Sequence, residues 1–493
     1  MNPSRRTALK AISVGTITAF SGTVAWANFG QTKLRVRRAL TNMPLNDPDL
    51  STYRDFVGKM LAADQTKPVS WLGFASQHGT LSQGFKFCPH GDWYFLPWHR
   101  EYVMMYENAV RALMKNPDFA MPYWNWTEER LLPQAFSDST YNGKPNPLYI
   151  RNRNELVGSN ALTDSLVGQG VMDQIYAETV YELFGTTRNP AQMDLDPKWV
   201  PAGGGSQGIL ERTPHNMVHN NIGAFMPTAA SPRDPIFFMH HGNIDRIWAH
   251  WNALGRQNST DRLWLEMNFD NNYIAPDGTT YSRQVKDLLD TAALGYRYDV
   301  VPTPDGMKSS PRREAQMLAL ANSGLGAEIG GVQRVGSANR NMAMAVRPLD
   351  VPLQLKEGTV AASTVEDVNA ETPHVHVILK DIAVGDDVRG IRVFLNRDDL
   401  TVDVPDSDPH FVTTFGFLAH GAAGHGANVA EEGAHKRLHS VILDITETLK
   451  KLRSMKRLTN DEIKVQLIPV PAPGVTLEIV GSVVPASVEI ASF

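Results

Sequence analysis

The chain has 493 residues, of which 42% are hydrophobic and 20% charged, and its formal net charge is −5. This composition is typical of a folded globular protein and argues against a disordered chain or a membrane-embedded one. The slightly acidic balance, with no long basic run, argues against a nucleic-acid partner and fits a neutral or small polar substrate better. The length predicts two or three domains.

Residues 1–27 predict an export signal. The pair Arg5 and Arg6 precedes an apolar stretch that ends in Ala25-Trp26-Ala27, a small-residue pattern typical of a cleavage site. The arginine pair resembles a twin-arginine signal, which directs export of proteins that are already folded. We therefore expect an exported protein, periplasmic or secreted, with no membrane span after cleavage. A membrane anchor is the alternative, but Ser, Thr and Gly dilute the apolar run.

From residue 28 to about 301 the apolar spacing is mostly helical. A helix is predicted over Pro97–Met114, with its proline in the first turn. A second helix is predicted to begin at Thr213-Pro214 and to end at Gly223, and a third to begin at Asp234-Pro235.

The only cysteine, Cys88, begins the stretch CPHGDWYFLPWHREYVMMYE (88–107), which also contains His90 and His99. A single cysteine excludes an intramolecular disulfide, so stability must come from the core and from bound metal. Imidazoles buried among aromatic rings need partners for their polar nitrogens. These histidines therefore indicate a specific site.

Two further histidine pairs lie downstream. His215 and His219 are one helical turn apart and project from the same face, which is a chelating geometry but weak support by itself. In DPIFFMHHGNIDRIW, Asp245 lies one turn after His241 and is expected to accept a hydrogen bond from a ligating imidazole or its neighbour. This spacing favours His241 over His240 as a ligand.

Together the histidines form two groups of three: His78, His90 and His99, and His215, His219 and His241. Carried on different helices of a bundle core, they predict two adjacent three-imidazole sites. Imidazole ligands without a cysteine pair or carboxylate cluster suit copper or zinc and argue against Fe–S, calcium and magnesium. Zinc would leave one position open at each site, and a redox metal, copper, explains two such sites better.

Residues 302–345 read as a linker, and residues 346–493 as a β-rich domain. Strands are predicted at 374–379, 390–395, 463–470 and 475–484, and one helix at 438–452. Several such strands favour a β-sandwich. We therefore expect a mainly α protein, in which a four-helix-bundle core over residues 28–301 holds a binuclear metal site and a sandwich-like domain follows.

Two of these stretches resemble a known family. HGDWYFLPWHREYVMMYE (90–107) resembles the first copper-site signature of tyrosinases, and DPIFFMHHGNID (234–245) the second signature, shared by tyrosinases, catechol oxidases and hemocyanins. The resemblance implies two copper ions in a type 3 site, one bound by His78, His90 and His99 and the other by His215, His219 and His241.

The resemblance also implies roles for four neighbouring residues. Cys88 matches a cysteine that forms a thioether with the second ligand, here His90. Glu211 matches a glutamate that holds a water over the second copper, and Asn216 an asparagine that orients this water to deprotonate a phenol. The alternatives are a buried thiol for Cys88, a favourable charge at a helix N-terminus for Glu211 and an ordinary helix residue for Asn216.

The resemblance also implies a gate residue, which lies above the second copper and controls access to it. This residue is Thr228 when the position is counted back from Asp234, or Phe225 when it is counted forward from Gly223. A small residue there would admit monophenols.

The C-terminal region resembles, more weakly, the domain that keeps plant polyphenol oxidases latent. Its loop 410–426 is expected to reach over the site, with Phe415 or Phe417 as a plug. Five histidines in or near this loop would pass on copper or would simply be solvated: His410, His420, His425, His435 and His439.

The resemblance therefore implies a tyrosinase-like enzyme that uses O₂ to hydroxylate monophenols to o-diphenols and to oxidise o-diphenols to o-quinones. A catechol oxidase without monophenol hydroxylation, a hemocyanin-like oxygen carrier and a zinc hydrolase are the alternatives. The sequence leaves open the physiological phenol, cleavage of the C-terminal domain and the oligomeric state, a homo-oligomer included.

Overall fold

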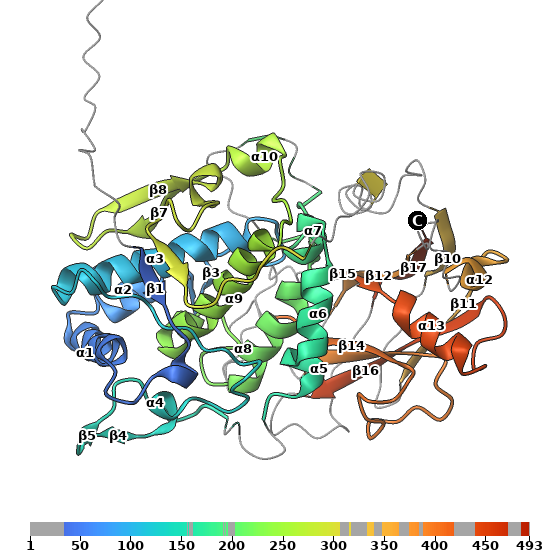
Figure 1. Cartoon of the computed structure of the whole chain (residues 1–493), viewed down its shortest axis with the longest axis horizontal. Coiled ribbons are helices and arrows are strands. Elements are labelled where there is room, and N and C mark those ends of the chain that lie inside the picture. Colours follow the sequence, from blue (N-terminus) through green and yellow to red (C-terminus); the bar gives the residue numbers. More distant parts are fainter. Residues whose placement is uncertain are drawn as a thin grey trace, which may run out of the picture.

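The computed structural model describes residues 34–154, 156, 161–190, 192, 194–195, 203–305, 315–316, 333–339, 348–363, 374–383, 388–418, 439–471 and 485–492. The predicted export signal, the predicted strand at 475–484 and three histidines of the C-terminal loop (His420, His425 and His435) lie outside the described residues. Figure 1 shows a helical part, built from residues up to 305, beside a β-rich part that begins at residue 333. No helix in the described ranges is long and apolar enough to span a membrane.

The helical part surrounds one large apolar core. Its helices are α1 (Pro48–Ala62), α2 (Trp71–Ala75), α3 (Phe95–Leu113), α4 (Gln134–Ser137), α5 (Asp164–Val167), α6 (Gln169–Ala177), α7 (Tyr181–Phe184), η3 (Glu211–His215), α8 (Asn216–Ile222), α9 (Ile236–Ala253) and α10 (Arg262–Leu265), with short turns η1 (Leu40–Asn42), η4 (Ser231–Arg233) and η5 (Val285–Leu288). Its short strands are β1 (Arg35–Arg37), β2 (Gly79–Thr80), β3 (Gly84–Phe85), β4 (Thr140–Tyr141), β5 (Lys144–Pro145), β6 (Ser206–Gln207), β7 (Asn268–Ile274), β8 (Thr280–Gln284) and β9 (Tyr296–Tyr298).

Two of the three predicted helices begin close to where they were expected. Helix α3 begins at Phe95 and has Pro97 in its first turn. Backbone N–H groups in the first turn have no acceptor within the helix, so proline costs no helical hydrogen bond there. Helix α9 follows Asp234-Pro235, and Asp234 Oδ1 accepts a hydrogen bond from the backbone N–H of Ile236 at 3.0 Å.

The prediction for the second helix start is wrong. Pro214 lies inside a π-helical turn, η3, which continues directly into α8. A proline in a regular helix removes one hydrogen bond and clashes with the preceding turn, and a widened turn accommodates it. Gly223, with φ 74°, ends the helix as expected.

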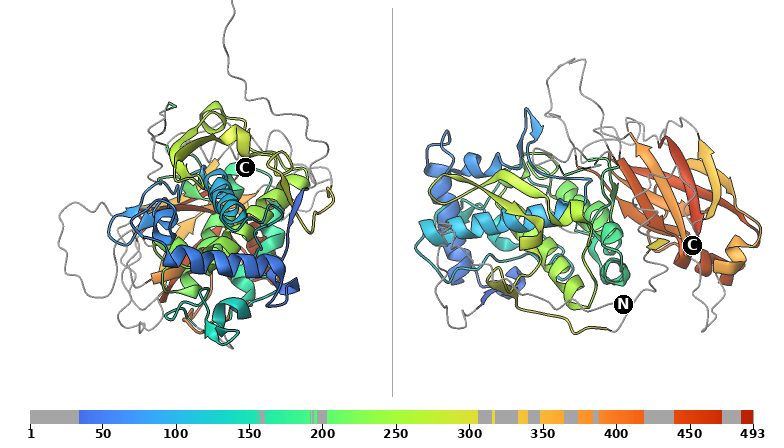
Figure 2. Two further views of the ribbon diagram at one scale, coloured as in Figure 1. Left: turned by 90° about the vertical axis from the view of Figure 1, so that its left-hand side faces the viewer. Right: turned by 90° about the horizontal axis from the view of Figure 1, so that it is seen from above.

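The β-rich part consists of two sheets that enclose a second apolar core (Figures 1 and 2). Its elements are β10 (Gln333–Asn339), β11 (Leu349–Gln354), α12 (Thr359–Ser363), β12 (Val375–Ile382), β13 (Val388–Leu395), β14 (Phe411–Phe415), β15 (His439–Asp444), α13 (Thr446–Ser454), β16 (Glu462–Pro471) and β17 (Ser487–Ser492). The strand orders are β10-β17-β12-β15-β6 and β11-β16-β13-β14. Strands β12, β13 and β16 confirm three of the four predicted strands.

Two sequence expectations for this part are wrong. The predicted helix at 438–452 begins as strand β15, in which Val441 and Leu443 alternate into the core. Helix α13 starts only after Asp444, whose Oδ1 accepts a hydrogen bond from the N–H of Thr446 at 2.8 Å. In addition, β10 pairs with β17 although it lies within the predicted linker 302–345, so the β-rich part begins before residue 346.

Strand β6 joins the two parts of the molecule. It belongs to the helical part by sequence, yet it pairs in parallel with β15, with Ser206 opposite Ser440 and Gln207 opposite Val441. The β-rich part therefore shares a sheet with a segment that lies just before the π-helical turn.

A buried ion-pair network ties β1, α3, α9 and β9 together. Asp245 accepts hydrogen bonds from Arg100 Nε at 2.5 Å and Arg37 Nη1 at 3.0 Å, and from the hydroxyls of Tyr296 and Tyr298, both at 2.6 Å. The expected hydrogen bond from an imidazole to Asp245 is absent among the described contacts. The one-turn spacing from His241 is real, but two arginines from other elements take the carboxylate oxygens.

Glu107 completes this network, and its pKa gives a pH-dependent prediction. Burial raises this pKa, but the nearby Arg37 and Arg111 guanidinium groups outweigh burial and bring it to about 2. A depressed folded-state pKa stabilises the protein above the unfolded value of roughly 4.3, and this stabilisation is lost as the pH falls towards 2. Urea unfolding should show Glu107→Gln about 3 kcal/mol less stable than wild type at pH 7, with the difference narrowing below pH ~4.3. A difference that does not change with pH would contradict this interpretation.

Candidate metal centre

All six histidines predicted as ligands converge in the helical core. They belong to two buried groups, His78, Cys88, His90 and His99, and His215, His219, His240 and His241, and within each group the potential ligand atoms lie within 4.8 Å of one another. The groups adjoin, because the rings of His99 and His241 stack with centroids 4.2 Å apart and those of His90 and His215 lie 5.3 Å apart. The two groups therefore form one centre.

Helices and turns share the positioning of these side chains. His99 lies on α3, His219 on α8 and His241 on α9, while His215 is the last residue of the π-helical turn. His78 and His90 lie in turns, so the expectation that all six ligands come from helices is wrong.

Glycines keep these two turns tight. Gly79, after His78, begins the β2–β3 hairpin, where an added Cβ would come within 2.4 Å of the Gly84 carbonyl oxygen. Gly91, after His90, has φ 68°, a backbone conformation that favours glycine.

Backbone carbonyls fix the tautomers of three ligand candidates. The Nδ1 atoms of His78, His99 and His219 lie 2.7, 2.8 and 2.6 Å from the carbonyl oxygens of Ala229, Phe95 and Met226. A carbonyl only accepts, so each Nδ1 carries the proton and each Nε2 carries a lone pair. These Nε2 atoms are thus prepared for metal ligation.

The remaining contacts also leave lone pairs inside the centre. His215 donates from Nδ1 to Asn216 Oδ1 at 2.8 Å, and its Nε2 is buried without a hydrogen-bond partner. His78 Nε2 lies 3.5 Å from His90 Nε2, and His219 Nε2 lies 3.2 Å from His241 Nε2.

The imidazoles are held in their neutral form. Burial lowers the pKa of His78 to about 3 and that of His219 to about 4, and it lowers the pKa values of the other four well below the usual range. Neutral imidazoles whose lone pairs face one another in a buried space fit bound metal cations.

His240 and His241 differ in their contacts. The indole Nε1 of Trp126 donates to His240 Nδ1 at 3.2 Å, so the proton of His240 lies on Nε2 and no lone pair faces the centre. His241 Nε2 faces His219 Nε2, while its Nδ1 has no hydrogen-bond partner among the described residues. This difference favours His241 as the ligand.

Glu211 lies beside His90. Its Oε1 accepts from the backbone N–H of Gly91 at 2.8 Å and lies 3.3 Å from His90 Nδ1, and Oε2 accepts from the Thr186 hydroxyl. Burial raises the pKa of Glu211 to about 8, whereas the two hydrogen bonds lower it. A metal cation nearby would favour the carboxylate form.

Asn216 contacts His215, as described, and donates from Nδ2 to the carbonyl oxygen of Gly416 at 2.7 Å and to Gln207 Oε1 at 3.0 Å. Its side-chain partners in the described structure are therefore protein groups, and Glu211 is not among them. The expectation that Asn216 and Glu211 hold one water together stays a prediction.

The other predicted site residues have different outcomes. Cys88 Sγ lies 3.2 Å from Nε2 of His99 and belongs to the same group of side chains as His90, and the thioether between Cys88 and His90 stays a prediction. The Thr228 hydroxyl donates to the carbonyl oxygen of Phe225 at 2.8 Å and so stabilises its own loop, while the Phe225 ring lies under the guanidinium of Arg233.

The two residues predicted as a plug lie in the β-rich part, and their role as a plug stays a prediction. Phe415 is part of the β-rich core, and its ring contacts Phe417, which stacks on His439 at 4.2 Å. No ring contact joins either phenylalanine to the metal-centre histidines in the described ranges. His410 donates from Nδ1 to the carbonyl oxygen of Leu395 at 2.6 Å, within the β-rich part.

Sequence reasoning missed the groups that orient the side chains beside the ligands. Thr186 donates to Glu211, Gln207 and the Gly416 carbonyl accept from Asn216, and Trp126 donates to His240; none of these four groups lies in a motif.

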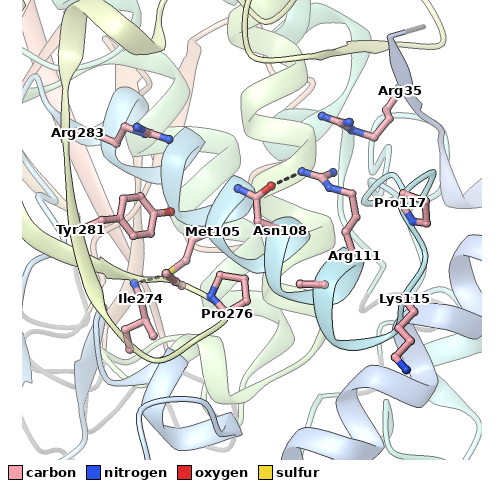
Figure 3. Close-up of a pocket in the computed structure, with 12 residues that line it drawn as sticks. Arg35, Met105, Asn108, Arg111, Lys115, Pro117, Ile274, Pro276, Tyr281 and Arg283 are labelled. Atoms are coloured by element: carbon pink, nitrogen blue, oxygen red, sulfur yellow. Dashed lines mark hydrogen bonds between the residues drawn. The ribbon is translucent and has the colours of Figure 1, made fainter. Parts of the chain in front are cut away.

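A pocket of about 890 Å³ lies beside α3 and is lined by Arg35, Arg111 and Arg283; it contains none of the histidines (Figure 3).

Comparisons with known proteins agree on one family. The common central domain of tyrosinase matches residues 68–254. A tyrosinase of Hahella sp. (strain CCB-MM4) is 26% identical over 86% of this chain and 93% of its own length. Polyphenol oxidase A1 of Vicia faba is 32% identical over 57% of this chain, and the match spans only 50% of that protein.

Solved structures share the fold over nearly the whole chain. A latent apple tyrosinase aligns with a TM-score of 0.65 at 22% identity, covering 94% of this chain and 98% of that one. A latent aurone synthase, a polyphenol oxidase, aligns with a TM-score of 0.62 at 19% identity, covering 93% and 90%. At this identity the likeness concerns the fold alone.

Proposed function

Since this chain is a member of the tyrosinase and polyphenol oxidase family, we propose that it is a binuclear copper oxidase that acts on small phenols with O₂ as the oxidant. The observation that carries the proposal is the set of neutral imidazoles whose Nε2 lone pairs share one buried centre. His78, His90 and His99 would hold one copper ion, and His215, His219 and His241 the other. Bound copper would supply the electron transfer to O₂ and a positive charge that favours a phenolate.

The chain's own groups would orient the ligands and move the proton. Carbonyls of Ala229, Phe95 and Met226 hold three imidazoles in one tautomer. Glu211 Oε1 lies 3.3 Å from His90 Nδ1, and this carboxylate would accept the phenol proton, directly or through a water. A phenol of pKa near ~10 needs such an acceptor before it can react as a phenolate.

We further propose that the enzyme hydroxylates monophenols and then oxidises the o-diphenols to o-quinones. One observation favours a catechol oxidase as second candidate: Asn216 already donates both its N–H groups, to Gln207 and Gly416, and its oxygen already accepts from His215, so only one lone pair of that oxygen is left for a water.

Oxygen uptake by the purified, copper-loaded protein would test this function, with a p-monophenol and the matching o-diphenol supplied separately. Uptake with both substrates supports the tyrosinase reaction, and uptake with the diphenol alone supports a catechol oxidase. Reversible oxygen binding without turnover of either substrate would contradict both and would indicate a hemocyanin-like carrier.

The role of Glu211 gives a separate prediction. Glu211→Gln keeps the size of the side chain but removes the proton acceptor, so kcat/KM for a monophenol should fall by about 10²-fold or more. Thr186→Val is the matched control, because it removes a hydrogen bond to Glu211 but leaves the carboxylate in place. Equal losses in the two variants, at full copper content, would mean that Glu211 only positions His90.

We also propose that residues 1–27 direct export through a twin-arginine route. Replacing Arg5 and Arg6 by Lys should leave the protein in the cytoplasm, and N-terminal sequencing of exported protein should begin near Asn28. Export of the unchanged length would argue against cleavage.

A further inference from the structure

The β-rich part docks on the helix that carries His215 and His219. The backbone N–H of Gly416 donates to the carbonyl oxygen of Arg212 at 2.8 Å, and Asn216 Nδ2 donates back to the Gly416 carbonyl oxygen at 2.7 Å. One turn further along, Asn220 Nδ2 donates to the carbonyl oxygens of Arg389 and Phe417, at 2.7 and 3.0 Å.

The amide of Asn216 has only one orientation that satisfies all its partners. Its NH₂ group donates to two acceptors, Gly416 O and Gln207 Oε1, which leaves Oδ1 to accept from His215 Nδ1. A flipped Asn216 amide would turn its oxygen towards the Gly416 carbonyl oxygen, which can only accept, whereas the Gln207 amide can present either its oxygen or its NH₂ group. The Gly416 carbonyl therefore orients the Asn216 amide, and Oδ1 of Asn216 then places the proton of His215 on Nδ1.

Both acceptors depend on the β-rich part. Gly416 follows β14 directly, and Gln207 lies in β6, which is held as the edge strand of the sheet by its pairing with β15. At Gly416 the backbone of the β-rich part lies very close to α8 and to β13. A Cβ added at this position would lie 2.6 Å from Met217 Sδ and 2.7 Å from the Arg389 carbonyl oxygen. The segment can therefore pack against α8 only with glycine at this position.

We propose that the docked β-rich part positions the metal ligand His215 through Asn216. In this relay the Gly416 carbonyl orients the Asn216 amide, and the amide keeps the His215 proton on Nδ1 and the lone pair of Nε2 directed at the metal. Docking of the β-rich part and metal affinity at the His215 side of the centre are then thermodynamically coupled, and the coupling acts in both directions. The inference rests on the proposed function only in taking His215 as a metal ligand.

The relay makes an asymmetric prediction. Of the three Nδ1 contacts on the other side of the centre, those of His78 and His99 end on carbonyls of the helical part. Loss of docking should therefore weaken the metal ion held by His215, His219 and His241 and leave the other ion nearly unchanged.

Asn216→Ala tests the relay, with Asn220→Ala as the matched control. Both residues lie on α8 and donate to the same docked segment, but only Asn216 contacts a histidine. Each variant is loaded with copper or, separately, with redox-silent zinc. The number of metal ions retained per chain is then measured at increasing concentrations of a chelator. We expect Asn216→Ala to lose one of its two ions at a chelator concentration about 10-fold lower than wild type does, because it lacks the hydrogen bond that orients a metal-ligating imidazole. Asn220→Ala removes two docking hydrogen bonds but keeps the Asn216–His215 contact, so as long as the β-rich part stays docked it should retain both ions as wild type does.

Hydrogen exchange at the Gly416 amide gives a readout that does not depend on turnover. Bound metal should slow this exchange in wild type and in Asn220→Ala, but not in Asn216→Ala. Wild-type protein that binds copper and takes up oxygen without metal-dependent protection at Gly416 would overturn the relay alone. Equal metal retention in the two variants would also overturn it, and wild-type protein that binds no copper would overturn both the relay and the proposed function.

Discussion

His219→Gln should bind one copper ion per chain in place of two and should lose oxidase activity. His219 offers Nε2 to the centre because its Nδ1 donates to the Met226 carbonyl oxygen, and the glutamine amide cannot replace the imidazole at the same position. Since electron transfer to O₂ would need both ions, kcat for o-diphenol oxidation should fall by about 10³-fold or more. Copper content by elemental analysis and oxygen uptake on the same preparation measure the two effects.

His240→Gln is the control for this variant. His240 is as buried as His219 and belongs to the same group of side chains, but its Nδ1 accepts from the Trp126 indole and its proton lies on Nε2. This variant should keep both copper ions and at least about a tenth of the activity, because only the packing of a neighbouring ring changes. Loss of one ion in His240→Gln but not in His219→Gln would reverse the ligand assignment.

Asp245→Ala should have the largest effect on stability. Arg37 and Arg100 are fully buried and both donate to this carboxylate, so the substitution leaves two buried cations short of a partner. Removing one member of such a buried network costs about 3–5 kcal/mol of the free energy of unfolding. The Tyr296 hydroxyl also loses its acceptor, whereas the Tyr298 hydroxyl can still donate to the Gly242 carbonyl oxygen. Chemical denaturation of the copper-free protein measures the effect without a contribution from metal binding.

Glu266→Ala provides the comparison. Glu266 forms an ion pair with Arg262, one helical turn earlier in the chain. The side chain of Glu266 is 48% exposed and that of Arg262 is 63% exposed. An exposed pair of this kind contributes roughly 0.3–0.5 kcal/mol. If Asp245→Ala were no more destabilising than Glu266→Ala, the buried network would not be what joins β1 and β9 to the long helices.

The convergence of the candidate ligands could be predicted in part, where it depends on local patterns. The one-turn spacing of His215 and His219 and the Asp234-Pro235 helix start depend only on neighbouring residues, and the structure has both. The Trp126 contact, which separates His240 from His241, joins segments 114 residues apart and has no local signature.

The errors have the same physical origin. A proline normally starts a helix, yet Pro214 lies within one because a π-helical turn accommodates it. The stretch 438–452 has apolar spacing that suits a helix, but the first half pairs with β12 and β6 and becomes a strand. Asp245 has the expected spacing from His241, but its partners are set by arginines 208 and 145 residues away in sequence. Tertiary contacts override local preference in each case.

Anomalous diffraction from a copper-loaded crystal would locate the metal ions and identify their ligands. We expect two copper peaks, one ligated through Nε2 of His78, His90 and His99 and the other through Nε2 of His215, His219 and His241. A single peak, or a second ion ligated by His240 in place of His241, would contradict this expectation.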